Sequence, residues 1–276
     1  MKNCSAVFLF LLLFLNGHET LATNMISFEI EMPSWVDADK ILPKYTKFTV
    51  VDMKTGRMFR AQRRAGSSHA DVQPLTPKDT KIMKKIYGGK WSWKRRSIYI
   101  LYQNRLIAAS MHGMPHGGGA LKNNFPGHFC IHFYGSSTHR SNSVDLSHQL
   151  MILKAGGHLE EYLNNASPYD IIHAYIIGLK QQDSSILSQI TLQPIKWRSV
   201  LNRVENIRIN RMPLLPAEDL TDQISISVPV TIEMQLKNRG NEQFHGEIHL
   251  VRFSTNETWK IDSAFLKNAN LMDDAK

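Results

Sequence analysis

Cys130 lies in the run Gly-His-Phe-Cys-Ile-His-Phe at positions 127–133, in which a histidine stands two positions to either side of the thiol. Side chains of a strand alternate between its two faces. This spacing therefore predicts His128, Cys130 and His132 on one face and apolar residues on the other. A free thiol has a pKa of about 8.5, and an imidazolium beside it favours the thiolate. The pattern indicates an activated cysteine nucleophile.

The N-terminus decides whether Cys130 has a disulfide partner. Lys2, the apolar run 6–15 and the small residues at 21–23 form the pattern of a secretory signal peptide, which we place at 1–23. The run is shorter than the about 20 residues that span a bilayer. Cleavage would remove Cys4, the other cysteine of the chain. Cys130 would then be either a buried inert thiol or a reactive one.

Histidines gather around this cysteine. Six of the twelve lie between positions 112 and 148: His112, His116, His128, His132, His139 and His148. The segment 114–127 is rich in glycine and proline, so it predicts a loop, and His112 and His116 are not the helical pair of a zinc protease. A hairpin-like loop would bring the strand ending at Met111 close to the cysteine strand.

Two short motifs resemble those of the L,D-transpeptidases. That family has a His-Gly pair, a glycine-containing loop and a Ser-His-Gly-Cys-Ile/Val-Arg run. Here His112-Gly113 precedes the run 127–132, and 18 positions separate His112 from Cys130. Three positions of the second motif differ from the family, where serine, glycine and arginine are usual: Gly127, Phe129 and His132.

The resemblance implies a role for each matching residue. Cys130 would be the acyl acceptor, His112 the general base and His128 a shaper of the oxyanion site, with Gly113 and His132 contacting substrate. The cysteine would attack a diaminopimelate or lysine carbonyl of a peptidoglycan stem peptide and expel D-alanine. A second amine or water would then resolve the acyl-enzyme, as a transpeptidase or a carboxypeptidase does. The resemblance implies no metal and no cofactor.

Two other classes of function stay open. His128 and His132, with His112 or His116, could hold zinc in a metal-dependent cell-wall hydrolase, where Cys130 would be a ligand or a bystander. The chain could also be a domain that only binds wall peptides. We favour the thiol chemistry because it accounts for both the cysteine and the spacing to His112.

His69 and Asp71 form a further polar pair upstream. They could be a metal or acid/base pair, but a polar loop before the helix start at Thr76 explains them as well.

The periodicity predicts two domains. The first, at 24–165, is mainly β with short helices, and the resemblance implies an L,D-transpeptidase-like β-sandwich. Its predicted hairpins pair 47–52 with 58–62 and 98–101 with 106–110. Helices are predicted to start after Thr76, with Pro77 first, and after Asp145, and to end at glycine pairs.

The second domain, at 168–276, is predicted to be α+β. Two helices cover 171–179 and 186–190, and apolar residues alternate through 224–236 as in a half-buried strand. Pro229 suggests that this strand is bent or lies at an edge. A hairpin of 246–253 with 258–265 follows. The order resembles the nuclear-transport-factor-like, cystatin-related cone fold, whose exported examples are accessory domains.

The chain carries 33 Lys and Arg against 24 Asp and Glu, a net charge of +9. A basic surface favours anionic partners, and for an exported protein these are wall polymers or a membrane surface. A solvated basic surface without a dedicated partner explains the charge equally well. Nucleic acid is not expected, because no binding motif is present. With the resemblance, this predicts a secreted, cell-wall-associated protein that acts on peptidoglycan stem peptides. The sequence does not fix the oligomeric state.

Overall fold

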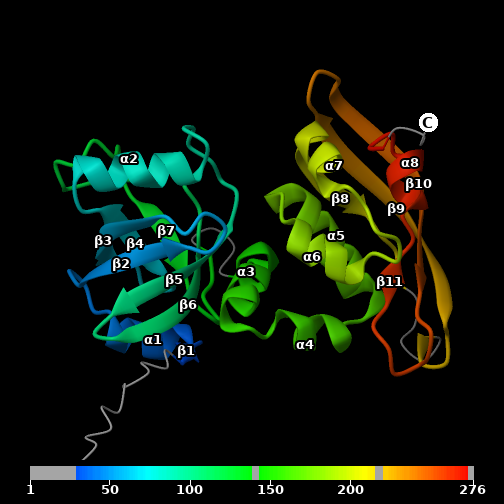
Figure 1. Cartoon of the computed structure of the whole chain (residues 1–276), viewed down its shortest axis with the longest axis horizontal. Helices are drawn as coiled ribbons and strands as arrows, with labels where there is room; N and C mark the ends of the chain where they lie inside the picture. The colour runs from blue at the N-terminus through cyan, green and yellow to red at the C-terminus, as the bar shows by residue number, and fades with distance from the viewer. Residues whose placement is uncertain (1–28, 139–142, 215–219, 273–276) are drawn as a thin grey trace, which may run out of the picture.

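The computed structural model describes residues 29–138, 143–214 and 220–272 (Figure 1). The predicted signal peptide at 1–23, and His139 among the six histidines between positions 112 and 148, lie outside these ranges. Within them, the helices are too short or too polar to cross a membrane. The fold is mixed α/β: a six-stranded antiparallel barrel is followed by helices and a curled four-stranded antiparallel sheet.

The barrel closes because one short strand pairs on both sides. Its strands are β2 (Lys47–Asp52), β3 (Met58–Ala65), β4 (Ala70–Pro74), β5 (Arg96–Tyr102), β6 (Arg105–Met111) and β7 (Phe129–His132). They follow the order β6-β5-β2-β3-β4-β7, and β7 pairs again with β6. Closure leaves no open edge, so the predicted β-sandwich is in fact a barrel. Its interior is apolar, with Val50, Val72, Ile98, Ile107 and Phe129 fully buried.

Short elements surround the barrel. They are β1 (Ile30–Glu31), which runs parallel to β6, and the helices α1 (Trp35–Ile41) and α2 (Pro77–Ile86). The Thr76 hydroxyl accepts a hydrogen bond from Asp79 N, and Pro77 is the first helical residue, as predicted. Both predicted hairpins are confirmed. Gln103 and Asn104 have positive φ (48° and 63°), which suits the tight turn between β5 and β6.

Two interpretations were left open for His69 and Asp71, and the polar loop does not hold for Asp71, because β4 runs through this position and all five of its residues are buried. Asp71 is the register partner of Cys130 on β7. Gln73 is buried because it binds the segment before β7: its Oε1 accepts from Ala120 N (3.0 Å), and its Nε2 donates to Gly127 O (2.8 Å). The polar residues of β4 therefore hold the cysteine strand and its loop.

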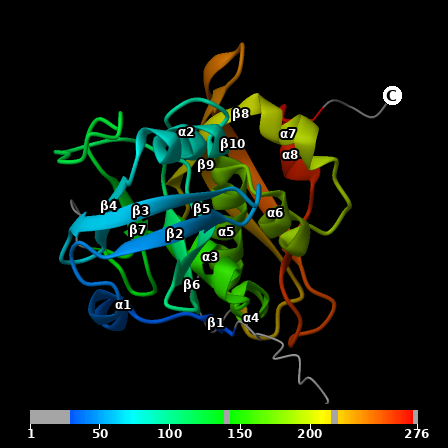
Figure 2. The same cartoon turned by 60° about the vertical axis from the view of Figure 1, so that its left-hand side comes forward.

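Helices and a curled sheet make up the rest of the molecule (Figures 1 and 2). The helices are α3 (Leu146–Gly156), α4 (Leu159–Asn164), α5 (Pro168–Gln181), α6 (Ser184–Ile190), α7 (Trp197–Arg203) and α8 (Ala264–Asn268). The strands are β8 (Val204–Arg211), β9 (Ser225–Leu236), β10 (Gly240–Val251) and β11 (Lys260–Ile261), in the order β11-β10-β9-β8. The predicted alternation in β9 is confirmed, since every second residue from Ile226 to Leu236 is buried.

Two details of this sheet differ from the prediction. β9 is central rather than at an edge, but β8 pairs with it only as far as Thr231, so Pro229 lies where β9 pairs with β10 alone. The segment 258–265 contributes only a two-residue strand, because α8 begins at Ala264. β10 starts as early as Gly240, since the turn residues Asn238 and Gly240 have positive φ and let it pair with β9 over twelve residues.

α3 joins the two parts. It contacts β5 and β6 of the barrel and also α5. Its Leu150, Met151 and Leu153 belong to the hydrophobic cluster of the C-terminal part. Asp145 caps it, as predicted, and binds Arg95 at 2.7 Å. The proposed boundary near 165–168 stays a prediction.

Candidate active site

β7 sets the direction of the cysteine. Phe129 and Ile131 are fully buried in the barrel core, while Cys130 and His132 point to the other side of the strand and are each 3% exposed. The predicted division of faces is therefore confirmed. Cys130 faces Asp71 of β4, and the Sγ lies 3.8 Å from Asp71 Oδ1. The thiol is buried but surrounded by polar groups.

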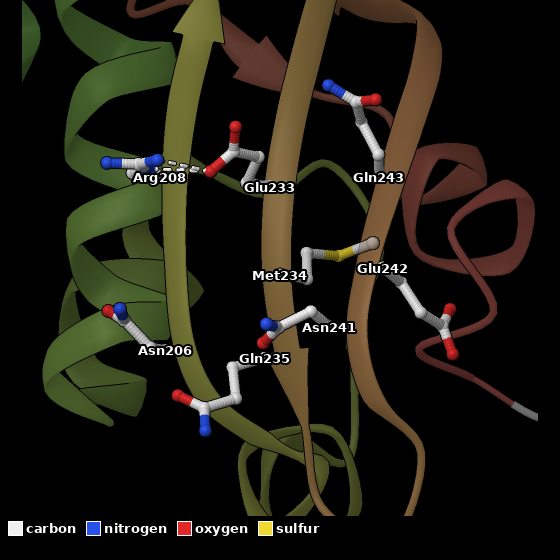
Figure 3. Close-up of a pocket in the computed structure, with 8 residues that line it drawn as sticks. All are labelled: Asn206, Arg208, Glu233, Met234, Gln235, Asn241, Glu242 and Gln243. Carbon is white, nitrogen blue, oxygen red and sulfur yellow. Dashed lines mark hydrogen bonds and ion pairs between the residues drawn. The ribbon is translucent and has the colours of Figure 1, made fainter.

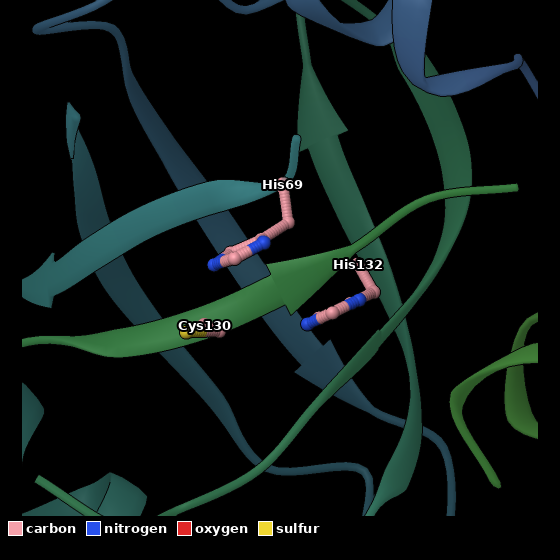
Figure 4. A group of neighbouring side chains, drawn as sticks. All are labelled: His69, Cys130 and His132. Carbon is pink, nitrogen blue, oxygen red and sulfur yellow. The ribbon is translucent and has the colours of Figure 1, made fainter. Parts of the chain in front are cut away.

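Six imidazole rings gather at this place, and we call them with Cys130 and Asp71 the histidine cluster: His69, His112, His116, His128, His132 and His148. Ring centroids of His116 and His128 are 4.4 Å apart. His132 is stacked between His69 (4.6 Å) and His148 (3.8 Å). Figure 4 shows His69 and His132 beside Cys130, from two neighbouring strand ends. The loop and strands thus converge as the sequence suggested.

His116 has the geometry of a base for the thiol. Its Nε2 lies 3.2 Å from Cys130 Sγ, and its Nδ1 lies 3.1 Å from Met114 O. A carbonyl oxygen only accepts, so Nδ1 carries the proton and the Nε2 lone pair faces the sulfur. The main chain of His116 pairs with that of His128 through two hydrogen bonds of 2.9 and 3.0 Å. These two hydrogen bonds hold the loop residue His116 in a fixed position beside the cysteine.

Two glycines make the bridge possible. Gly117 and Gly127 have φ of 57° and 115°, and a Cβ on Gly127 would lie 2.4 Å from His116 O. Only glycine fits such a position without moving the backbone.

His112, the predicted base, is 4% exposed and lies in the same group as His116 and Cys130, with donor atoms within 4.8 Å. Its Nδ1 accepts from Met114 N at 3.3 Å, so the neutral ring carries its proton on Nε2. Burial, followed by the nearby His116, holds the pKa of His112 well below its ordinary value. The role of His112 stays a prediction. The structure adds His116 as a base, which the sequence analysis had named only among the clustered histidines and candidate zinc ligands.

The other predicted site residues lie in or beside the cluster. His128 donates from Nδ1 to Gly118 O (3.0 Å), and its Nε2 lies 3.5 Å from Asp71 Oδ1. Gly113 lies under the ring of Tyr87, where a Cβ would come within 2.3 Å of a ring carbon. His132 is held in the ring stack described above. Their oxyanion and substrate-binding roles stay predictions.

His69 and Asp71 join the site; the sequence had left both a metal or acid/base pair and a polar loop open for them. His69 donates from Nδ1 to Ser137 O (2.8 Å), and its Nε2 lies 3.4 Å from Asp71 Oδ1. The signal that could have found them is the alternation of Ala70 and Val72 with polar neighbours, which is typical of a strand.

The resting thiol is neutral, contrary to the expected thiolate. Burial raises the pKa of Cys130, and the negative charge and hydrogen bond of Asp71 raise it further. The thiol must therefore lose its proton to a base as it attacks.

Alkylation tests this state. The rate of Cys130 modification by iodoacetamide is expected to rise steeply only at alkaline pH, because the thiolate is scarce below the raised pKa. Asp71→Asn removes a charge that raises this pKa, so modification at pH 8 is expected to be faster, by about tenfold for each pKa unit lost. Intact mass measures both rates. Cys130→Ala is the control, because any adduct that it still forms reports modification of Cys4. A rate that already levels off near pH 7 would contradict a neutral thiol.

Trp93 covers one side of the cluster. Its side chain is 50% exposed, and its ring lies 4.7 Å from His112 and 5.4 Å from His116, centroid to centroid. A cavity of about 380 Å³ adjoins it, lined in part by Lys94 and Lys180. Burial lowers the pKa of Lys94 to about 8.

A second hollow, of about 480 Å³, lies against β8, β9 and β10 (Figure 3). Its lining is mostly polar, and its Arg208 and Glu233 are paired at 2.5 Å. Neither cysteine nor histidine lines it. Between these two places, the side chains suited to nucleophilic or acid/base catalysis therefore lie around Cys130.

Comparisons with protein-family models, with curated proteins and with solved structures gave no match. The site is accordingly defined by its own geometry: a buried neutral thiol, an imidazole whose lone pair faces it, and a carboxylate between two further histidines.

Proposed function

We propose that this chain is an exported cysteine acyltransferase of the L,D-transpeptidase type that acts on peptidoglycan stem peptides. The observation that carries the proposal is the approach of His116 Nε2 to Cys130 Sγ at 3.2 Å, with the tautomer of His116 fixed by Met114 O. The resemblance of His112-Gly113 and of the run 127–132 supplies the substrate class. In this proposal the barrel is the catalytic domain, and the curled sheet with its helices is a nuclear-transport-factor-like accessory domain.

The first half-reaction forms a thioester. The Sγ proton passes to His116 Nε2 while the sulfur attacks the carbonyl carbon of a diaminopimelate or lysine residue. The tetrahedral intermediate collapses when the protonated His116 gives this proton to the departing D-alanine nitrogen. General-base help from such a histidine is worth about 10²- to 10⁴-fold in rate.

The second half-reaction restores the thiol. His116 takes a proton from the amine of a second stem peptide, or from water, as that group attacks the thioester carbonyl. The C–S bond breaks, and the sulfur recovers a proton from His116. An amine acceptor gives a crosslink, and water gives a trimmed peptide.

The negative charge of Asp71 suits this cycle. Its Oδ1 lies 3.8 Å from Sγ, beside the place where an imidazolium forms. Burial, followed by this charge, raises the pKa of the thiol and keeps it protonated at rest, so ionisation is coupled to attack.

A carbapenem is the direct probe, because its β-lactam carbonyl acylates a thiol nucleophile of this type. Intact mass of the wild-type protein is expected to increase by one carbapenem, and Cys130→Ala is expected to show no adduct. An unchanged wild-type mass after prolonged exposure would count against the proposal.

Two measurements separate the other classes. Release of D-alanine from a stem peptide by the wild type would exclude a domain that only binds. Full turnover by protein treated with a chelator would exclude a metal-dependent hydrolase.

A further inference from the structure

Three histidines of the cluster share one arrangement. Each donates its Nδ1 proton to a main-chain carbonyl: His69 to Ser137 O (2.8 Å), His116 to Met114 O (3.1 Å) and His128 to Gly118 O (3.0 Å). A carbonyl accepts only, so each neutral ring presents a lone pair at Nε2. Such an outer hydrogen bond is the usual way in which proteins orient a metal-binding imidazole.

The three Nε2 atoms point at the acidic side of the site. Those of His69 and His128 lie 3.4 and 3.5 Å from Asp71 Oδ1, and that of His116 lies 3.2 Å from Cys130 Sγ. Lone pairs that face a carboxylate repel it unless a cation lies among them. Protons on the rings satisfy this condition, and so does a metal ion bound beside Asp71.

The donor set selects the kind of metal. Thiolate, imidazole and a single carboxylate oxygen are typical zinc ligands, whereas magnesium and calcium prefer oxygen alone. The donor atoms of Asp71, His128 and Cys130 all lie within 4.8 Å of one another. The side chains of His128 and Asp71 are 17% and 11% exposed, which gives an ion a route inward.

We propose that Cys130 Sγ, His128 Nε2 and Asp71 Oδ1 bind one Zn²⁺ ion, and that the bound ion blocks the cysteine as a nucleophile. The thiol proton leaves to solvent as the S–Zn bond forms, and a chelator reverses the step without any change of oxidation state. Zinc binding stands on the geometry alone. The block of acyl transfer rests on the proposed function.

The other histidine groups near Cys130 fit an ion less well. His112 accepts from Met114 N through Nδ1, so its neutral ring has the proton on Nε2. The rings of His69 and His132 are stacked with only 6° between their planes, and lone pairs in parallel planes do not converge on one point.

Co²⁺ reports on this site directly, because a cobalt–thiolate bond gives a charge-transfer band in the near ultraviolet. Wild-type protein is expected to develop the band with one equivalent of Co²⁺ and to lose it when one equivalent of Zn²⁺ is added. Cys130→Ala is expected to show no band. Asp71→Asn and His128→Gln are expected to weaken binding by at least about tenfold. His158→Gln, a change of an exposed histidine ahead of α4, serves as the matched control and is expected to bind normally.

Thermal unfolding of each metal-free variant shows that the change acts on binding rather than on folding. No band in the wild type, or unchanged affinity in both Asp71→Asn and His128→Gln, would overturn the site. So would loss of the band in His69→Gln or His132→Gln with His128→Gln unaffected.

A carbapenem arm separates this inference from the proposed function. One equivalent of Zn²⁺ is expected to prevent the adduct, and a chelator to restore it. Acylation that continues with zinc bound would overturn the block. If metal-free protein never forms the adduct although the cobalt band appears, the acyltransferase proposal fails and the metal site remains.

Discussion

Replacing His116 by glutamine is expected to lower the rate of carbapenem acylation of Cys130 by about 10²- to 10⁴-fold, the usual contribution of a placed general base. The reason is the 3.2 Å contact between Nε2 and Sγ, which glutamine cannot replace as a proton acceptor. The thiol is neutral at rest because burial and Asp71 raise its pKa, so attack without a base is slow. The second-order rate of adduct formation, followed by intact mass, measures the effect.

His112→Gln is the matched control, since it changes a buried histidine of the same loop. We expect it to lower the rate by less than about tenfold, because His112 presents Nε2 as a donor. The reverse ranking of the two variants would return the base to His112, as the motif resemblance implies.

The second large effect is on stability. Asp52 is fully buried on β2, where its oxygens accept two hydrogen bonds from Arg96 (2.7 and 2.5 Å) and one from Thr55 N (2.9 Å). Asp52→Ala leaves the guanidinium of Arg96, whose side chain is 15% exposed, without its carboxylate. Such a loss costs about 3–5 kcal/mol of unfolding free energy. For a chain of this size that corresponds to a fall in Tm of roughly 6–20 °C.

Two comparison variants make this result specific. The exposed pair of Arg208 and Glu233 has side chains 64% and 37% accessible, so Glu233→Ala is expected to cost less than about 1 kcal/mol. Asp52→Ala combined with Arg96→Met should be more stable than Asp52→Ala alone, because the stranded charge is gone. Equal losses in Asp52→Ala and Glu233→Ala, read by urea unfolding, would contradict the importance of the buried pair.

Short-range signals predicted most of the elements. The Thr76 cap with Pro77 began a helix at the expected residue, and the alternation ending at Leu236 gave β9. These signals work because a cap or a face depends on neighbours a few residues away. The sequence did not decide the structure at Asp71, whose polar character also fitted a loop. Its burial depends on partners such as Cys130, 59 positions later in the chain.

Barrel closure was visible in the sequence only in part. The loop after Met111 was expected to bring β6 close to β7, but the pairing of the four-residue β7 with β4 joins strands that are far apart in the chain. No local pattern encodes which edges meet, because that choice is made by burial of the common core.

The sequence by itself determined the composition of the candidate site: one thiol on the polar side of a strand with apolar residues behind it, and histidines concentrated near it. Tertiary structure alone decided which of those groups touch. Strand alternation and clustering are properties of adjacent residues, whereas a 3.2 Å contact between Cys130 and His116 depends on a bridge between two loop segments. The same folding step buried the thiol, which raises its pKa most, and brought in His69 and Asp71, whose negative charge raises that pKa further.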